Sequence, residues 1–300
     1  MNARIDVVIV SYNSADTLRS CVEPLLDQPG ITVTVVDNAS TDGSLATLAG
    51  LGVNAIDAER NGGFGFGCNL GMTAGSAPLV LFLNPDARVE RADLARLEAV
   101  LEAEPEVALV GPRLVDSDGE LIPSIRRWQR PGTVWSQAMF LHRLFPRAAW
   151  ANEIASAHER YETVEYPEWI SGACMLGRRD ALEAIGGFDE SFFLYCEDMD
   201  LCAELVKHGH RIRYEPGATV HHVGGHSAPR SSLLPVLATS RVLFARKHAS
   251  PFSARIQRLG IAVDAATHSF AALRRPSYAR GHFAALGSTL RRRVVGHNAG

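Results

Sequence analysis

The sequence predicts an α/β protein built on a doubly wound, mostly parallel sheet. Short β-branched runs alternate with helical segments over the first hundred residues, and polar loops follow the ends of these runs. The chain has 300 residues, of which 46% are hydrophobic and 21% charged, so it can bury a large core without disulfides. We therefore expect one large α/β domain with an appendage.

Four strands are expected in the first third of the chain. Ile5–Val10 is a continuous apolar run, as in a strand buried on both faces. Three further strands are expected at Thr32–Val36, Val53–Ile56 and Leu79–Leu83. Helices are expected between them: one from about Asp16 with Ser14 as its cap, one after Gly67, and one over Ala92–Ala103.

Regular structure is harder to predict beyond these elements. Asp116–Gly119 indicates a hairpin turn, and residues 125–168 have no clean period. We interpret 125–168 as a mobile connection over the face that carries the functional site. Later elements are expected as a strand at Trp169–Gly177, helices at Arg179–Ile185 and Glu197–His208, and a strand that ends at His221 and His222.

Charge is unevenly distributed along the chain. From Arg230 onward there are twelve basic residues and one acid, so this tail carries about +11 and the remainder about −14. Such a tail predicts an anionic partner.

The five cysteines are scattered without a CxxC pair, which favours a reducing compartment. Neither a signal peptide nor an apolar run of roughly 20 residues is visible.

Polar residues follow each of the four expected strands. They are Ser11, Tyr12 and Asn13 after the first strand, Asp37 after the second, Asn61 and Gly62 after the third, and Asp86 after the fourth. Each taken alone can be a turn or a helix cap. Because parallel strands end at one edge of the sheet, where ligands bind in open α/β folds, the set together predicts a binding site.

A dinucleotide-binding fold is the first alternative. Gly63–Gly67 is rich in glycine and precedes an expected helix, but its spacing departs from GxGxxG at Cys68. It also follows the third strand, whereas that fingerprint follows the first. The small residues here indicate close backbone approach to a nucleotide or a neighbouring helix instead.

Two groups of residues could carry chemistry. Asp86, in Asn84-Pro85-Asp86, could hold a divalent cation that neutralises a diphosphate leaving group, with His222 as a second ligand. Glu197, Asp198 and Asp200 lie in the first turn of an expected helix, and Asp198 projects about 100° away from the other two. One of these acids could act as a general base; the alternative is compensation of the helix dipole.

Together these motifs resemble the family 2 glycosyltransferases of GT-A fold over about Ile5 to Ser227. The segments that carry the resemblance are Val10–Asn13, Val36–Ser44, Asn61–Gly65, Asn84–Asp86, Gly186–Glu190 and Glu197–Asp200. Asn84 stands where the wider family often has Asp. This Asn-Pro-Asp form, Trp169–Gly172, His221-His222 and the basic tail are similar to bacterial rhamnosyltransferases that act on polyprenyl-diphosphate-linked N-acetylglucosamine.

The resemblance implies a role for each matching position. Ser11, Tyr12, Asn13 and Asp37 would hold the nucleoside, with Asn61, Gly62 and Asn84 beside the nucleotide sugar. Asp86, with His222, would bind Mg²⁺ or Mn²⁺ beneath the diphosphate. Asp198 would be the base of an inverting single displacement. Glu197, Trp169, Ser171 and Gly172 would lie on the acceptor side.

The resulting expectation is an inverting, metal-dependent rhamnosyltransferase with dTDP-rhamnose as donor and a lipid-linked or saccharide acceptor, in cell-envelope polysaccharide synthesis. Two alternatives remain: the same chemistry with a UDP-hexose donor, or a non-catalytic nucleotide-sugar-binding protein. Residues 1–227 would form the catalytic domain, and 228–300 a basic helical extension on the anionic inner face of the plasma membrane. No nucleic-acid partner is expected, because no aromatic residues interleave with the basic ones. The oligomeric state is open.

Overall fold

The structure is a computed structural model that describes residues 3–26, 28–224 and 229–291. Its main sheet has the strand order β3-β2-β1-β4-β10-β6-β11-β5, with β7 paired to β6. The bounds of these strands are β1 Ile5–Ser11, β2 Ile31–Asp37, β3 Asn54–Asp57, β4 Leu79–Leu83, β5 Ala87–Val89, β6 Val107–Val115, β7 Leu121–Ile122, β10 Cys174–Arg178 and β11 Arg211–His222. The strands β3, β2, β1 and β4 run parallel, as do β6 and β11. The expected mostly parallel α/β sheet is confirmed.

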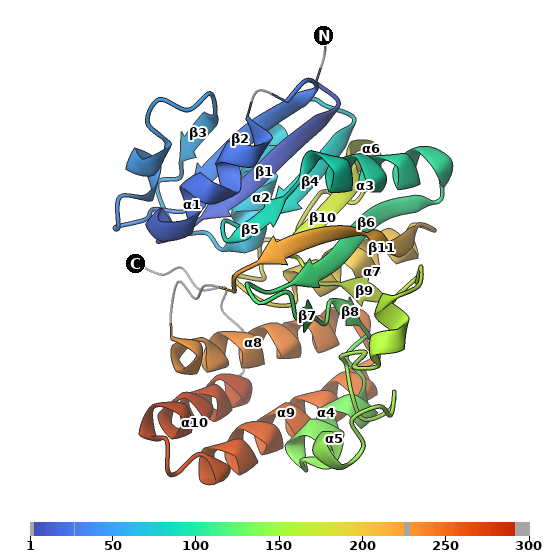
Figure 1. The fold of residues 1–300 in the computed structure, drawn as a ribbon. Coiled ribbons are helices and arrows are strands. Elements are labelled where there is room, and N and C mark those ends of the chain that lie inside the picture. The colour runs from blue at the N-terminus through green and yellow to red at the C-terminus, as the bar shows by residue number, and fades with distance from the viewer. Residues whose placement is uncertain (1–2, 27, 225–228, 292–300) are drawn as a thin grey trace.

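Helices cover both faces of this sheet (Figure 1). One apolar core joins α1 (Ala15–Val22) and α3 (Arg91–Ala103) to one side of β1 and β4. A second core joins α2 (Phe64–Thr73), α6 (Arg179–Ala184) and α7 (Glu197–Lys207) to the other side. The chain also forms four short helices: η1 Glu23–Leu25, η2 Ser44–Leu48, α5 Leu141–Leu144 and η3 His158–Tyr161.

Glycine allows α2 to lie directly on β1. A Cβ at Gly71 would overlap the Val8 side chain, and one at Gly67 would overlap Val10. The glycines of this segment therefore serve helix–strand packing, which is one of the two uses that the sequence left open.

A bundle of helices lies beside the sheet, in the lower part of Figure 1. It consists of α8 (Arg230–His248), α9 (Pro251–Ala271), α10 (Pro276–Leu290) and α4 (Pro131–Ala138). Its core contains Val134, Val242, Ile261 and Ala285. Among the residues described, no helix is long and apolar enough to cross a membrane.

The expected strand Trp169–Gly177 is wrong as a single element. β9 (Trp169–Ile170) pairs with β8 (Ile125–Arg126) in a separate small sheet, and β10 joins the main sheet. The break falls at Ser171–Ala173, where the Gly172 N–H donates to the Asp198 Oδ2 at 3.0 Å. At Gly172, a hydrogen bond to a side chain of a distant helix thus replaces the backbone pairing of a strand.

Residues 125–168 also differ from the expected irregular connection. They contain β8, α4, α5 and η3, and Tyr161 is fully buried against Tyr214. The Tyr161 hydroxyl donates to the Ala155 carbonyl at 2.8 Å. The segment lacks a clean period because its helices pack on the C-terminal bundle and on β11 at once.

Candidate active site

Polar side chains meet at the carboxyl ends of β1 and β2, as the sequence predicts. Ser11 pairs in register with Asp37, and both are buried, at 0% and 3% exposed. The Asp37 carboxylate accepts hydrogen bonds from the Ser40 N–H at 2.9 Å and from the Ser40 hydroxyl at 2.6 Å. The loop after β2 is thereby fixed around its carboxylate.

Asn13 holds two loops together at the same edge of the sheet. It adopts a left-handed φ of 51°, and its Oδ1 accepts from the Thr41 N–H at 2.9 Å. Its own N–H donates to the Ser40 hydroxyl at 2.9 Å. The contacts of Asn13 therefore join the loops after β1 and β2, with half-buried Tyr12 beside it.

Asn38 is a site residue that the sequence reasoning missed. Its Nδ2 donates to the Gly63 carbonyl at 2.8 Å, which ties the loop after β2 to the loop after β3. Its Oδ1 is buried without a hydrogen-bond partner in the described structure, and so is the Ser11 hydroxyl. Two such acceptors at one strand edge suit a ligand with N–H or O–H groups. The signals in the sequence were the adjacent Asp37 and the segment Val36–Ser44, which contains Asn38.

The glycines after β3 bring two loops together. The Asn61 Oδ1 accepts from the Gly63 N–H at 3.0 Å, and the Phe64 N–H donates to the Phe193 carbonyl at 3.1 Å. Gly63 has a φ of 93°, and a Cβ there would overlap the Phe193 carbonyl; one at Gly62 would overlap the Phe66 ring. Glycine is required for this approach.

Asp86 and His222 lie together at the end of β4. The His222 Nε2 is 3.1 Å from the Asp86 Oδ1 and 3.3 Å from the Asn84 Nδ2. β5 pairs antiparallel with the end of β11, with His222 opposite Ala87, and this pairing sets the contact. Both side chains are mostly buried, at 9% and 17% exposed. A carboxylate and an imidazole at this distance fit a divalent cation that takes its other ligands from a diphosphate.

The Ser171–Ala173 turn links this pair to the start of α7. The Asn84 N–H donates to the Ala173 carbonyl at 2.9 Å, and Gly172 holds the Asp198 carboxylate. Asp86 and Asp198 therefore lie on either side of one turn. A nucleotide sugar over Asp86 would thus have Asp198 on its acceptor side.

Asp198 is held in one orientation by backbone. Its Oδ2 accepts from the Gly172 N–H at 3.0 Å and its Oδ1 from the Met199 N–H at 2.8 Å. Tyr195 and Cys196 adopt left-handed φ values of 66° and 65°, which turn the chain sharply into α7. Burial raises the pKa of Asp198, while the two N–H groups and the Arg126 charge partly oppose the rise. A carboxyl group whose pKa is raised, but whose charged form is still stabilised by these neighbours, suits a general base.

Glu197 lies deeper than Asp198. It is 6% exposed, and its Oε2 is buried without a hydrogen-bond partner among the described residues. Burial raises the pKa of Glu197 well above its ordinary value, and the Asp198 carboxylate adds to the rise. Glu197 is consequently the poorer base of the two, because its environment favours the protonated form.

Asp200 points away from the site, toward α8. Its Oδ1 is 2.6 Å from the His248 Nε2, and its Oδ2 is 2.9 Å from the Lys247 Nζ, which also lies 2.7 Å from Asp189. Asp200, Glu204 and His248 could by spacing hold a metal ion. The lysine ammonium already compensates their charge, so we interpret the cluster as ion pairs that join α7 to α8.

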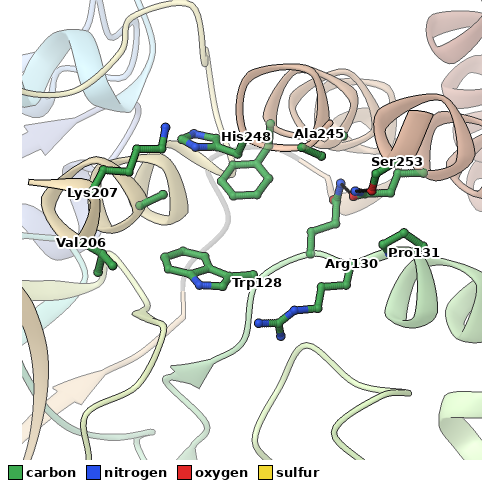
Figure 2. Close-up of a pocket in the computed structure, with 13 residues that line it drawn as sticks. Trp128, Arg130, Pro131, Val206, Lys207, Ala245, His248 and Ser253 are labelled. Carbon is green, nitrogen blue, oxygen red and sulfur yellow. Dashed lines mark hydrogen bonds between the residues drawn. The ribbon is translucent and has the colours of Figure 1, made fainter. Parts of the chain in front are cut away.

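A cavity of about 350 Å³ opens at the other end of α7 (Figure 2). Trp128, Val206, Phe244 and His248 are among its lining residues, which come from α7, α8, α9, the start of α4 and the segment before it. None of the predicted site residues lines it. We place the candidate site at the strand edge and not in this cavity, because the predicted polar residues and the Asp86–His222 pair converge at that edge.

Comparison with known proteins shows the family of this chain. Residues 6–186 match the sequence profile of Glycosyl transferase family 2. An N-acetylglucosaminyl-diphospho-decaprenol L-rhamnosyltransferase of Mycobacterium tuberculosis is 32% identical over 265 residues, which are 81% of this chain and 85% of that protein. The hexosyltransferase Agl10 of low-salt glycan biosynthesis in Haloferax volcanii is 25% identical, over 66% of this chain and 60% of its own length.

Solved structures share the fold. A Pyrobaculum calidifontis mannosyltransferase, PcManGT, in complex with GDP-Man and Mn²⁺, superposes with a TM-score of 0.57 at 18% identity, over 97% of this chain and 88% of that one. S. aureus TarS 1–349 in complex with UDP-GlcNAc superposes with a TM-score of 0.59 at 17% identity, over 96% and 80%. The expected GT-A fold with C-terminal helices is confirmed, and so is the resemblance to rhamnosyltransferases. This chain belongs to glycosyl transferase family 2.

Proposed function

We propose that this protein is an inverting, metal-dependent rhamnosyltransferase that transfers L-rhamnose from dTDP-rhamnose to lipid-linked N-acetylglucosamine in cell-envelope polysaccharide synthesis. One observation supports this proposal above the others: the Asp86–His222 pair lies on one side of the Ser171–Ala173 turn and Asp198 on the other. The donor sugar and the acceptor are proposed from the name of the mycobacterial relative, which is 32% identical over most of both chains.

The donor would lie along the ends of β1, β2 and β4. Ser11 and Asn38 offer buried hydrogen-bond acceptors to the pyrimidine ring of the nucleotide, and Asp37 and Tyr12 flank these two residues. Asn61 and Gly62 shape the loop beside the ribose, and Asn84 would orient His222. A Mg²⁺ or Mn²⁺ ion bound by Asp86 and His222 would stabilise negative charge on the departing diphosphate.

Asp198 would act as the base. Its carboxylate takes the proton of the acceptor hydroxyl while that oxygen bonds to the anomeric carbon and the bond from this carbon to the diphosphate breaks. A single displacement of this kind inverts the anomeric centre. Because Gly172 and Met199 fix both carboxylate oxygens, little reorientation is needed in the transition state. A protein that only binds nucleotide sugars has no use for such a group.

The C-terminal bundle would place the protein on the inner face of the plasma membrane. It exposes large apolar side chains from α5, α9, α10 and the connecting loops, namely Met139, Leu144, Phe145, Trp150, Phe252, Leu259, Phe270, Leu273, Phe283 and Leu290. Exposed arginines lie among them: Arg143, Arg147, Arg255, Arg274, Arg275, Arg280 and Arg291. Aromatic and basic side chains on one unit suit an anionic lipid surface.

Some of the tail residues expected at the membrane do not face outward. Lys247 is ion-paired with Asp189 and Asp200, and Val242, Phe244, Ile261 and Ala265 are buried. Arg292, Arg293 and the proposed domain boundary at 227/228 lie outside the described residues. The division into a catalytic part, 1–227, and an extension, 228–300, is therefore kept as a proposal.

Transfer assays with a donor panel test the proposal. We expect dTDP-rhamnose to give rhamnosyl product and free dTDP with an N-acetylglucosaminyl-diphospho-lipid acceptor, and excess chelator to stop the reaction. Product from UDP-hexoses but not from dTDP-rhamnose would favour the donor alternative. Donor binding without product or nucleotide release from any donor would favour a non-catalytic binding protein.

A further inference from the structure

Arg126 has an unusual environment for a cation. It lies on β8, opposite Trp169 of β9, and its guanidinium carbon lies 5.8 Å from the centre of the Trp169 ring. Its Nε is fully enclosed and has no hydrogen-bond partner, and no hydrogen bond or ion pair links its guanidinium to any described residue. A buried donor left in this way costs stability, so it indicates a ligand that the protein is built to receive.

The other charges around Arg126 are already compensated. Glu153 is ion-paired with Arg241 and accepts a hydrogen bond from Thr133 at 3.0 Å. Tyr161 donates its hydroxyl proton to a backbone carbonyl. Asp198 is the third acidic group near Arg126, and its carboxylate oxygens accept hydrogen bonds from the Gly172 and Met199 N–H groups. Burial lowers the pKa of Arg126, and Asp198 is the largest opposing influence.

Arg126 also lies on the acceptor side of the site. β8 pairs with β9 and not with the main sheet, so it is separate from the strand edge that holds Ser11, Asp37 and Asp86. The Ser171 N–H donates to the Ser124 carbonyl at 3.1 Å, and this bond brings β8 against the turn that carries Gly172 and Asp198. An anion bound by Arg126 would therefore belong to the acceptor and not to the donor.

We propose that Arg126 binds a phosphate of the acceptor, so that this protein selects a sugar linked through diphosphate over the same sugar without it. This inference rests on the proposed function, because it takes Asp198 as the group that accepts the proton of the acceptor hydroxyl. A planar guanidinium backed by an indole ring can present its remaining N–H donors to phosphate oxygens in a fixed direction. The acceptor hydroxyl and its phosphate would then be held at opposite ends of one sugar ring.

The test compares two acceptors across four proteins. The acceptors are N-acetylglucosamine linked through diphosphate to a short alkyl chain, and an alkyl N-acetylglucosaminide without phosphate. The proteins are the wild type, Arg126→Gln, Arg126→Lys and Arg127→Gln. Arg127 is the matched control, because it is the next residue and its guanidinium donates to the Asn152 and Ile154 carbonyls instead.

We expect Arg126→Gln to lower kcat/KM about ten- to hundredfold more for the diphosphate acceptor than for the phosphate-free acceptor, and this difference should lie in KM. Any effect that acts through the Asp198 carboxylate should appear in kcat for both acceptors alike. Arg126→Lys should recover part of the loss, and Arg127→Gln should affect both acceptors equally. Binding of the diphosphate acceptor in the presence of dTDP, measured by calorimetry, should weaken in parallel and needs no turnover.

The outcomes separate this inference from the proposed function. Equal losses on both acceptors, or unchanged binding of the diphosphate acceptor in Arg126→Gln and Arg126→Lys, would overturn the role of Arg126. No transfer by the wild type to either acceptor would overturn the proposed function, and the calorimetric comparison would still decide whether Arg126 binds the diphosphate.

Discussion

Asp198 provides the sharpest test at the scale of single residues. Asp198→Asn keeps the side-chain shape but cannot accept a proton, so transfer should slow by roughly 10²–10⁴-fold. Donor affinity should be unchanged, because Asp198 lies across the turn from Asp86. Steady-state rates and dTDP binding measure the two effects. Asp118→Asn, an exposed acid in the β6–β7 hairpin, is the control. A near-normal rate would move the base to Glu197 or Asp189.

Asp86 and His222 predict where the metal binds. Asp86→Ala should weaken Mn²⁺ binding in the presence of dTDP and reduce transfer at least about a hundredfold, since charge stabilisation by a metal is worth several kcal/mol. Calorimetry measures the first and rate assays the second, while circular dichroism checks that the fold is kept. Unchanged Mn²⁺ affinity in both Asp86→Ala and His222→Gln would contradict this site.

Glu197 predicts a pH-dependent change in stability. Its pKa is raised in the folded protein, so the folded state keeps a proton that the unfolded state releases. Stability therefore falls as pH rises from the ordinary carboxyl range through the raised pKa. Glu197→Gln removes this cost. The thermal midpoint should match the wild type at acid pH and exceed it by roughly 2 °C or more at neutral pH, as about 1 kcal/mol would give. Equal midpoints at every pH would refute this reasoning.

At the scale of elements, α10 offers a matched pair of glycines that tests how the bundle packs. A Cβ at Gly281 would overlap the Ser231 carbonyl of α8, whereas nothing lies within 4 Å of one at Gly287. Gly281→Ala should therefore lower the thermal midpoint. Gly287→Ala should leave it equal or slightly higher, because alanine favours helix by about 0.5–1 kcal/mol. Equal effects of the two substitutions would mean that α10 does not pack tightly on α8.

The strand break at Ser171–Ala173 shows what element-level prediction lacks. Trp169 to Gly177 reads as one apolar run, and the helix start at Glu197 was predicted correctly. The hydrogen bond between Gly172 and Asp198 joins positions 26 residues apart, and it ends one strand and begins another. Local periodicity carries no information about such a pair.

At the scale of the whole molecule, the exposed apolar and basic side chains predict membrane binding. Phe140 contacts His268 at 4.3 Å between ring centres, and His268 contacts His282 at 5.4 Å, so α5, α9 and α10 meet at one end of the bundle. The protein should co-sediment with anionic vesicles, and less so at high salt, since each basic residue near the surface contributes about 1 kcal/mol.

Substitutions can distinguish membrane binding through the bundle surface from non-specific adsorption through any exposed apolar side chain. The triple variant Phe270→Ser, Leu273→Ser and Phe283→Ser should weaken co-sedimentation. A control with Val164→Ser, Tyr166→Ser and Val206→Ser, which are exposed outside the bundle, should not. If the wild type ignores anionic vesicles at low salt, the bundle has a structural role only, and the membrane location is wrong.

The sequence by itself determined the first four strands, the polar residues at their ends and the family. These follow from local rules, because β-branched runs make buried strands and parallel strands end together, which brings Ser11 beside Asp37. The tertiary structure alone decided the contact of His222 with Asp86, the orientation of Asp198 and the lack of a hydrogen-bond partner for the Arg126 guanidinium among the described residues. Each depends on residues far apart in the chain, such as Asp86 and His222, whose numbers differ by 136. Side-chain distance and burial across such separations arise only from packing, which no local pattern encodes.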